Sequence, residues 1–326
     1  MLRRTMLAGS AAMFTTALTG PSKAQSPAPE SLIQRIKIAT VGAPDVKKVE
    51  EWYTKYLGFK VVERSKVSDA MATSWGTPKM AGRPFVAMSS AGSPDVLYRA
   101  VQIDPVPGYK GMTTWGWNAI ENIVESPDTV HEKLKNSPFR FVGGPAFISG
   151  GKSTIKAVQY AGPAEEILYF TAETGDRAKS GLPLAKAFVD RPFIMVLAGP
   201  DAEVLCAFYM DVFKMNGYMP RETTISIIAA AQGLPEDYSF ALGLVRGKEQ
   251  GNSIEIDRYP PSAKQRPRNE GQLPPGVAMA SFSVASLDGI NVKYITPPQK
   301  LYGDKRAASF LGPTGELVEL IEEKRP

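Results

Sequence analysis

The feature that most constrains the fold of this chain is an internal repeat with a period of about 150 residues. One helical stretch begins at Asp45 and reaches Tyr53, and another begins at Asp201 and reaches Tyr209, so both copies keep the same spacing from aspartate to tyrosine. Each stretch follows a short apolar segment and precedes segments rich in β-branched and aromatic residues, which are typical of strands. The pattern predicts a βαβββ module that occurs at least twice.

Two weaker copies lie between and after these modules. Apolar segments lead into a helical stretch at Asp128 and into a helical or turn segment around Asp288. Their closing segments match better, because a Gly-Pro pair at 162–163 and at 312–313 precedes an alternating strand in both copies. We therefore predict an α+β fold in which four βαβββ modules pair into two domains.

The simplest division places consecutive modules together. It assigns residues 32–173 to a domain of modules one and two, and residues 190–323 to a domain of modules three and four. The charged stretch 175–186, which contains proline and glycine, is the expected linker. A second loop, 259–276, carries several prolines and joins module three to module four.

Residues 1–24 have the pattern of an export signal and are excluded from the fold. Arg3-Arg4 precedes a weakly apolar run over 6–18, and Ser22-Lys23-Ala24 has a small-x-small cleavage pattern. Twin arginines favour the twin-arginine route to a bacterial periplasm, with a general secretory signal as the alternative. No stretch approaches the roughly 20 apolar residues that a membrane-spanning helix needs, so membrane insertion is not expected.

The charge of the chain lies largely in that leader. It carries three of the 38 basic residues and no acidic one, against 33 acidic residues in the whole chain. The one short basic run, 264–268, is too small for a nucleic-acid surface. Cys206 is the single cysteine, so an intramolecular disulfide is impossible. The expected partner is a small molecule, and the protein is expected to be a monomer or a homodimer.

Two of the repeated segments resemble the vicinal oxygen chelate superfamily, which includes glyoxalase I, bleomycin-resistance proteins and extradiol dioxygenases. One is the strand with Asp-Val, Trp-Tyr and Leu-Gly-Phe between Asp45 and Phe59, and the other is Gly-Pro-Thr-Gly-Glu-Leu-Val-Glu-Leu at 312–320. The resemblance implies that paired modules form a U-shaped sheet with a small-molecule site on its concave face. It also implies metal ligands on the first and last strands of each module.

Carried over residue by residue, the resemblance implies a chain that is poor in metal ligands. The first-strand positions hold no ligand side chain, and the last-strand positions hold two glutamates: Ile38, Ala119, Ile194 and Met279 on first strands, and Gln102, Tyr169, Glu255 and Glu319 on last strands. The single histidine, His131, is expected on a solvated helix. A catalytic zinc or iron site is therefore not expected, and a carboxylate-only Mg²⁺, Mn²⁺ or Ca²⁺ site at Glu255 and Glu319 is the alternative.

Strand alternation places Glu319, and also Ser253, Glu255 and Asp257, on the concave side of the C-terminal domain. Two partly shielded carboxyl groups on facing strands favour a general base, Glu319, with Glu255 as its acid partner. The alternative is that both are scaffold positions that are hydrogen-bonded within the sheet. Both interpretations remain open from the sequence.

The N-terminal domain has a more aromatic set of candidates. Tyr169, Trp117, Glu121, Gln102 and Thr40 are the expected residues of its concave face, with Trp75 and Trp115 near the rim. The strand over 96–104 has an ambiguous register, so Tyr98 and Arg99 compete for the inward position. Glu121 beside a tyrosine hydroxyl would move a proton without a metal.

Two classes of function follow from these residues. The first is a metal-independent lyase, isomerase or hydratase that acts on a small aromatic or carbonyl compound by proton transfer. The second is a non-catalytic binding or resistance protein that uses the same cup. A carboxyl group that titrates near neutral pH would favour the enzyme.

Overall fold

The computed structural model describes residues 30–148, 153–177, 179–235 and 237–324, so the predicted export signal lies outside the described residues. Module one comprises β1 (Ile33–Ala43), α1 (Val46–Trp52) with a π-helical turn η1 (Tyr53–Leu57), β2 (Lys60–Lys66), β3 (Pro84–Ser89) and β4 (Leu97–Gln102). A short helix α2 (Asp69–Ser74) and a 3₁₀ turn η2 (Pro78–Met80) lie between β2 and β3.

The other modules follow the same order of elements. Module two comprises β5 (Gly116–Val124), α3 (Pro127–Leu134), β6 (Arg140–Phe147), β7 (Ile155–Ala161) and β8 (Ile167–Glu173). Module three comprises β9 (Val189–Gly199), α4 (Ala202–Phe213), β10 (Asn216–Thr224), α5 (Ser226–Gln232), β11 (Ser239–Arg246) and β12 (Ser253–Arg258). Module four has a turn in place of its helix and comprises β13 (Gly276–Val284), β14 (Gln299–Tyr302), β15 (Lys305–Leu311) and β16 (Leu317–Glu322).

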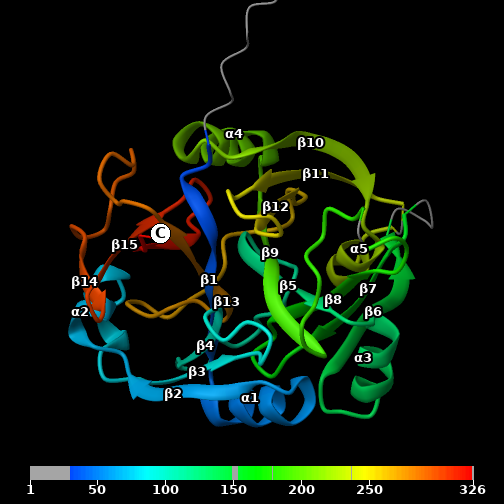
Figure 1. Cartoon of the computed structure of the whole chain (residues 1–326), viewed down its shortest axis with the longest axis horizontal. Helices are drawn as coiled ribbons and strands as arrows, with labels where there is room; N and C mark the ends of the chain where they lie inside the picture. Colours follow the sequence, from blue (N-terminus) through cyan, green and yellow to red (C-terminus); the bar gives the residue numbers. More distant parts are fainter. Residues whose placement is uncertain (1–29, 149–152, 178, 236, 325–326) are drawn as a thin grey trace, which may run out of the picture.

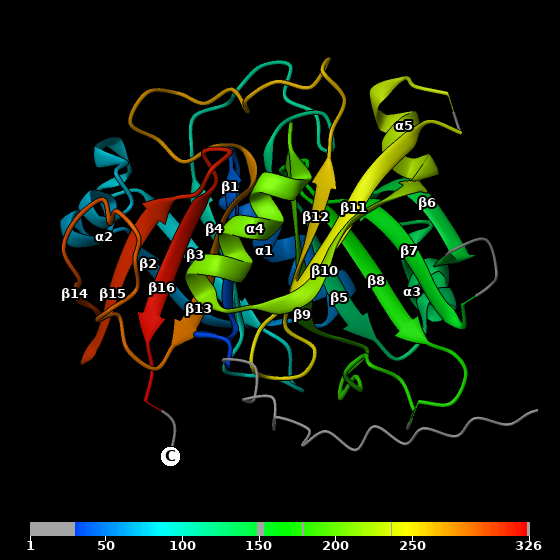
Figure 2. The same ribbon diagram turned by 90° about the horizontal axis from the view of Figure 1, so that it is seen from above.

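The strands form two curled eight-stranded sheets that lie side by side (Figures 1 and 2). Sheet A has the order β14-β15-β16-β13-β1-β4-β3-β2, and sheet B has the order β10-β11-β12-β9-β5-β8-β7-β6. The α+β fold of paired βαβββ modules is therefore confirmed. We call the concave face of sheet A cup A and that of sheet B cup B.

The predicted pairing of consecutive modules is wrong. Strand β1 pairs with β13, with Ile38 opposite Ser281, and β5 pairs with β9, with Glu121 opposite Ile194. Modules one and four therefore build sheet A, and modules two and three build sheet B, so neither 32–173 nor 190–323 holds a whole sheet. The first strand of each module has an edge that can pair with the first strand of any other module. The repeat alone therefore does not determine which two modules form a sheet.

The predicted linker also changes role with this pairing. The stretch 175–186 joins β8 to β9, which both belong to sheet B. The chain crosses between the sheets at 103–115 and at 259–275, and Arg266 holds these two crossings together. Its Nε donates to Thr114 Oγ1 at 3.0 Å, and its Nη1 donates to the Val277 carbonyl at 2.6 Å.

The repeated motifs have direct structural reasons. Asp45 and Asp201 are the N-cap residues of α1 and α4, where each carboxylate accepts a backbone N–H of the first helical turn. At the Gly-Pro turns, a β-carbon on Gly162 would lie 1.9 Å from Glu166 Oε1, and one on Gly312 would lie 1.9 Å from Glu316 Oε1. Glycine is needed there because a buried carboxyl group folds back over the turn.

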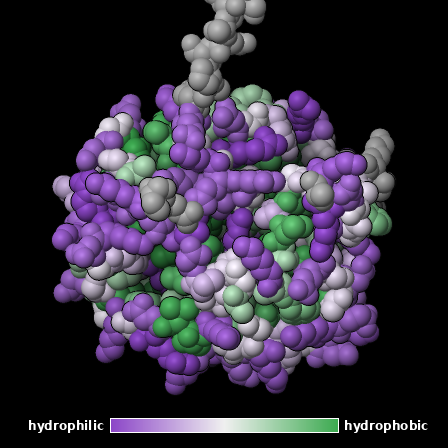
Figure 3. Space-filling view, viewed as in Figure 1, coloured by the Kyte–Doolittle hydropathy of each residue, from purple (hydrophilic) through white to green (hydrophobic). Residues whose placement is uncertain are grey.

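The main core lies behind the two cups, between the sheets and helices α1, α3 and α4. Each cup has its own smaller apolar cluster that includes a short helix: Met71 and Ala72 of α2 in cup A, and Ile228 and Ala229 of α5 in cup B. The face seen in Figure 3 is mainly hydrophilic. Within the described ranges, no helix is both long and apolar enough to cross a membrane.

Candidate functional site

Cup A contains a buried ion pair between Arg99 of β4 and Glu319 of β16. Arg99 Nη2 lies 3.4 Å from Glu319 Oε2, and the two side chains are 2 % and 0 % exposed. Burial lowers the pKa of Arg99, but Tyr302 and Glu319 more than offset this, so the guanidinium remains charged. Two opposite charges therefore neutralise each other inside cup A.

The remaining hydrogen-bonding capacity of this pair is used within the protein. Glu319 accepts from Trp75 Nε1 at 2.8 Å, from Ser281 Oγ at 2.6 Å and from the Tyr302 hydroxyl at 2.9 Å. Arg99 donates to Thr40 Oγ1 at 3.0 Å, and its guanidinium lies 4.6 Å from the centre of the Trp75 ring. A carboxylate with all these partners and an adjacent cation has little capacity left for a ligand.

Cup B contains three carboxyl groups, Glu121, Glu255 and Asp257. Glu121 on β5 lies opposite Tyr169 on β8, and Glu255 on β12 lies opposite Val196 on β9. Asp257 is two residues beyond Glu255 on the same strand and therefore faces the same side. Glu255 is partly exposed, whereas Glu121 and Asp257 are buried.

These carboxyl groups have few partners. Glu121 accepts a hydrogen bond of 2.5 Å from Thr171 Oγ1. Both carboxyl oxygens of Asp257 and the hydroxyl of Tyr259 are buried without a hydrogen-bond partner. Over the described ranges, no lysine, arginine or histidine forms an ion pair with any of the three carboxyl groups. None of the three acids therefore has an ion-pair partner within those ranges; Arg221 and Arg246 face the same side of sheet B but lie over the ring of Tyr218, at 5.6 and 5.7 Å from its centre.

Burial accounts for most of the electrostatic behaviour of cup B. It raises the pKa of Glu121 to about 7, against the opposing effect of the Thr171 hydrogen bond, and it raises the pKa of Asp257 to about 7. The pKa of Glu255 is raised well above its usual value by burial and by the charges of Asp257 and Glu121. At neutral pH the cup therefore holds protonated and ionised carboxyl groups side by side.

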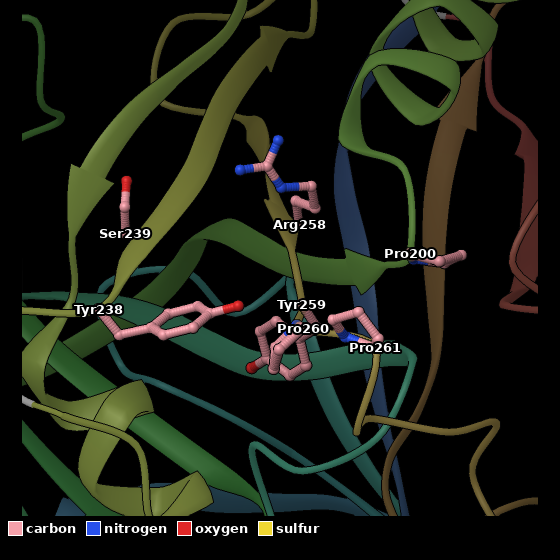
Figure 4. A pocket seen from close by; sticks show the side chains of 7 residues that line it. All are labelled: Pro200, Tyr238, Ser239, Arg258, Tyr259, Pro260 and Pro261. Carbon is pink, nitrogen blue, oxygen red and sulfur yellow. The ribbon is translucent and has the colours of Figure 1, made fainter.

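A cavity of about 270 Å³ adjoins this cluster, lined by the side chains of Pro200, Tyr238, Ser239, Arg258, Tyr259, Pro260 and Pro261. Figure 4 shows the hydroxyl of Tyr238 directed toward Tyr259, while Arg258 points away from the two rings. Burial and then the charge of Asp257 raise the pKa of Tyr259. Tyr259 of the cavity wall therefore lies near Asp257, although none of the three carboxyl groups lines the cavity itself.

Three predicted ligand-binding residues lie outside both cups. Trp117 is in the core between the sheets, where its Nε1 donates to the Leu317 carbonyl at 2.8 Å. Tyr98 packs under α1 against Phe59. The side chain of Gln102 lies at the start of α1, where its Oε1 accepts a hydrogen bond of 3.4 Å from the Val46 N–H. The alternation of β4 sends Arg99 inward and Tyr98 outward, which resolves the ambiguous register.

The predicted acid and base pair is also corrected by the module pairing. Glu319 lies in sheet A and Glu255 in sheet B, so they cannot share a substrate, and they cannot form the alternative divalent-cation site. The predicted N-terminal set separates in the same way. Glu121 and Tyr169 lie in cup B, whereas Trp75 and Thr40 lie in cup A.

Some residues of the two sites were missed from the sequence. Alternation from Glu255 predicts the inward Asp257, and its next step, Tyr259, was an available signal that the sequence analysis did not use. Tyr302 and Ser281 come from other strands and meet Glu319 only in the folded sheet. No local pattern marks them.

The residues at the family's metal-ligand positions do not fit a catalytic metal. In cup A the last-strand position that matches Glu255 holds Arg99 and not the predicted Gln102, and a guanidinium is a cation without an electron pair to donate. In cup B the first strand of module three holds Ile194. Among the described residues, no group of three or more histidine, cysteine, aspartate or glutamate side chains is arranged to hold a metal ion. His131 lies on α3, with its Nδ1 2.8 Å from the Tyr160 hydroxyl.

No protein-family model and no curated protein matches this sequence. Solved structures do match the fold. Glyoxalase I from Zea mays superposes with a TM-score of 0.59 at 15% identity, over 88% of this chain and 92% of that chain. A proposed dioxygenase from Bacillus subtilis superposes with a TM-score of 0.58 at 12% identity, over 91% of this chain and 86% of that chain. At such identities the likeness concerns the fold.

Proposed function

We propose that this chain, which has the vicinal oxygen chelate fold, is a metal-independent lyase or isomerase that moves a proton on a small aromatic or carbonyl compound in cup B. The observation that carries the proposal is that Glu121 and Glu255 share one cup with Tyr169, while burial raises the pKa of Glu121 to about 7 and the pKa of Glu255 well above its usual value. Buried carboxyl groups with separated pKa values are typical of acid and base pairs.

The two pKa values suggest the role of each group. Glu121, with a pKa of about 7, is half ionised at neutral pH and serves as the base that removes a proton from the carbon next to a carbonyl group. Glu255, whose pKa burial raises well above its usual value, is the group that donates a proton to the carbonyl oxygen, which gives an enol. Glu121 then delivers the proton it took to another carbon, while the enol oxygen returns its proton to Glu255, which gives the isomer and restores both groups.

Hydrogen exchange tests this proposal without knowledge of the natural substrate. Small aryl ketones and β-dicarbonyl compounds are incubated with the protein in D₂O, and loss of the α-proton signals is followed by NMR. Exchange that depends on protein and disappears in Glu121→Gln supports the enzyme. The matched control is Glu203→Gln, which removes an exposed carboxyl group from α4.

A non-catalytic binding protein is the second candidate. The cavity beside Tyr238 and Tyr259 and the apolar cluster of cup B favour it, because such surfaces bind organic rings without any chemistry. Ligand binding without exchange in any variant would support this candidate over the enzyme.

We also propose export to the periplasm by the twin-arginine route, on the basis of Arg3-Arg4 and the small-x-small pattern that ends at Ala24. Mass spectrometry of the protein from an expressing bacterium checks this. A mature chain that begins near residue 25 in the periplasmic fraction, lost when Arg3 and Arg4 are both replaced by lysine, is expected. Retention of the full chain in the cytoplasm would contradict it.

A further inference from the structure

We infer that cup B binds an organic cation, a protonated amine with an aromatic or apolar body. This inference names the ligand class of the proposed site, but it does not depend on the proposed reaction. Its basis is the charge balance of cup B, the unpartnered atoms in it and the aromatic wall of the adjoining cavity.

The comparison with cup A shows what cup B lacks. Arg99 is the third residue of β4 and Glu255 is the third residue of β12, so the two occupy matching places in modules one and three. In cup A this place supplies the cation that pairs with Glu319. In cup B it supplies another acid. A positively charged ligand would complete in cup B the balance that Arg99 provides in cup A.

Asp257 points most directly to such a ligand. It is 0 % exposed, it faces the cup, and neither of its carboxyl oxygens has a hydrogen-bond partner. A buried carboxyl group that lacks hydrogen-bond partners destabilises the folded chain, and a ligand that supplies donors removes this penalty. A primary ammonium group has three N–H donors and a positive charge, which match the two free oxygens of Asp257 and the neighbouring carboxyl groups.

The aromatic residues suit the remainder of the ligand. Tyr169 lies opposite Glu121 on the neighbouring strand, and Tyr238 and Tyr259 line the cavity of about 270 Å³. Ring faces attract cations and also stack on aromatic ligands. Three arginines lie near the cup without forming an ion pair with its acids. Arg258 Nη2 lies 2.6 Å from Glu222 Oε1, whereas Arg221 and Arg246 lie over the Tyr218 ring.

Calorimetric titration with three probes of similar shape tests the inference. Benzylammonium, benzyl alcohol and benzoate share a ring but carry positive, zero and negative charge. Benzylammonium is expected to bind about tenfold more tightly than benzyl alcohol, and benzoate more weakly than both. Its affinity should increase from pH 6 to pH 8 as Asp257 ionises. Equal affinities, tighter binding of benzoate, or stabilisation by Mg²⁺, Mn²⁺ or Ca²⁺ in place of benzylammonium would overturn the inference.

Variants separate a binding role from a structural one. Asp257→Asn keeps the size of the side chain, so it is expected to weaken benzylammonium binding by about tenfold and to raise the Tm, because it removes an unpaired buried charge. Glu255→Gln is the second variant if Asp257→Asn does not fold, and it should also weaken binding. Glu203→Gln should bind as the wild type does. If the wild-type protein binds benzylammonium but catalyses no hydrogen exchange, only the proposed reaction is wrong. If it catalyses exchange but does not bind benzylammonium, only this inference is wrong.

Discussion

The Tyr53 hydroxyl donates a hydrogen bond of 2.9 Å to Glu166 Oε1, and Tyr209 makes the same bond to Glu316 Oε1 at 3.0 Å. Each tyrosine ends the aspartate-to-tyrosine spacing of an odd-numbered module, and each glutamate follows the Gly-Pro turn of the next module. The aspartate-to-tyrosine spacing and the Gly-Pro turn, the two motifs that repeat in the sequence, therefore supply the two partners of one hydrogen bond. Consecutive modules meet through this contact behind the sheets, while each sheet is built from modules one and four or two and three.

This contact predicts how stability depends on pH. Burial raises the pKa of Glu166 and of Glu316 to about 7, from an ordinary value of 4.5. Between these values the unfolded chain has lost the proton that the folded chain keeps. Stability is therefore highest below about pH 4.5 for these groups and decreases as the pH rises to about 7. The buried acids of cup B act in the same direction.

Urea unfolding at pH 5 and pH 8 measures this effect. The free energy of unfolding is expected to be lower at pH 8, and Glu166→Gln should reduce the difference, because glutamine does not titrate. The exposed replacement Glu63→Gln is the control. Greater stability at pH 8 than at pH 5 would contradict the assignment.

A second prediction concerns the ion pair of cup A. Replacing Arg99 by methionine leaves Glu319 buried without a counter-charge, which is expected to cost about 3–5 kcal/mol of unfolding free energy. The double variant Arg99→Met and Glu319→Gln should recover part of that loss, since no unpaired charge remains. Chemical denaturation of both variants at pH 7 gives the two values. A double variant less stable than Arg99→Met would show that the pair is not the source of the effect.

A third prediction concerns metal content. Protein purified without added metal should carry well under one equivalent of transition metal, because Arg99 and Ile194 hold positions where the fold family has ligands. A chelator should leave the Tm unchanged. Stoichiometric zinc, iron, manganese or nickel that resists dialysis would restore the metal-enzyme hypothesis.

A fourth prediction follows from the crossed pairing of the modules. Cleavage within 175–186 should yield two fragments that remain associated, because sheet A and sheet B each contain strands from both sides of the cut. Size-exclusion chromatography of the nicked protein should show one species of unchanged size. Separation into independently folded 32–173 and 190–323 fragments would contradict the sheet order.

The four modules could be predicted from the sequence, but the way in which they pair into sheets could not. Helix caps such as Asp45, and turns such as Gly162-Pro163, act over a few residues, so a local pattern reveals them. The pairing of β1 with β13 joins residues far apart in sequence, and each first strand has the same apolar character. The error in pairing then placed Glu319 beside Glu255. Asp257 was visible as an inward residue, but its lack of a partner depends on what surrounds it in the folded cup.

The last prediction tests which cup carries out the chemistry. A general base contributes about 10²- to 10⁴-fold to a rate, so Glu121→Gln should lower hydrogen exchange by at least about 10²-fold, and Glu255→Gln should do the same if it is the acid. Glu319→Gln should leave exchange intact, because its carboxyl group is held by Trp75 and Arg99 in the other sheet, and should lower only the Tm. Initial exchange rates by NMR, measured beside unfolding curves, separate the two effects. Should Glu319→Gln abolish exchange while Glu121→Gln and Glu255→Gln leave it unchanged, the reaction takes place in cup A, and the acid and base assignment to cup B is wrong.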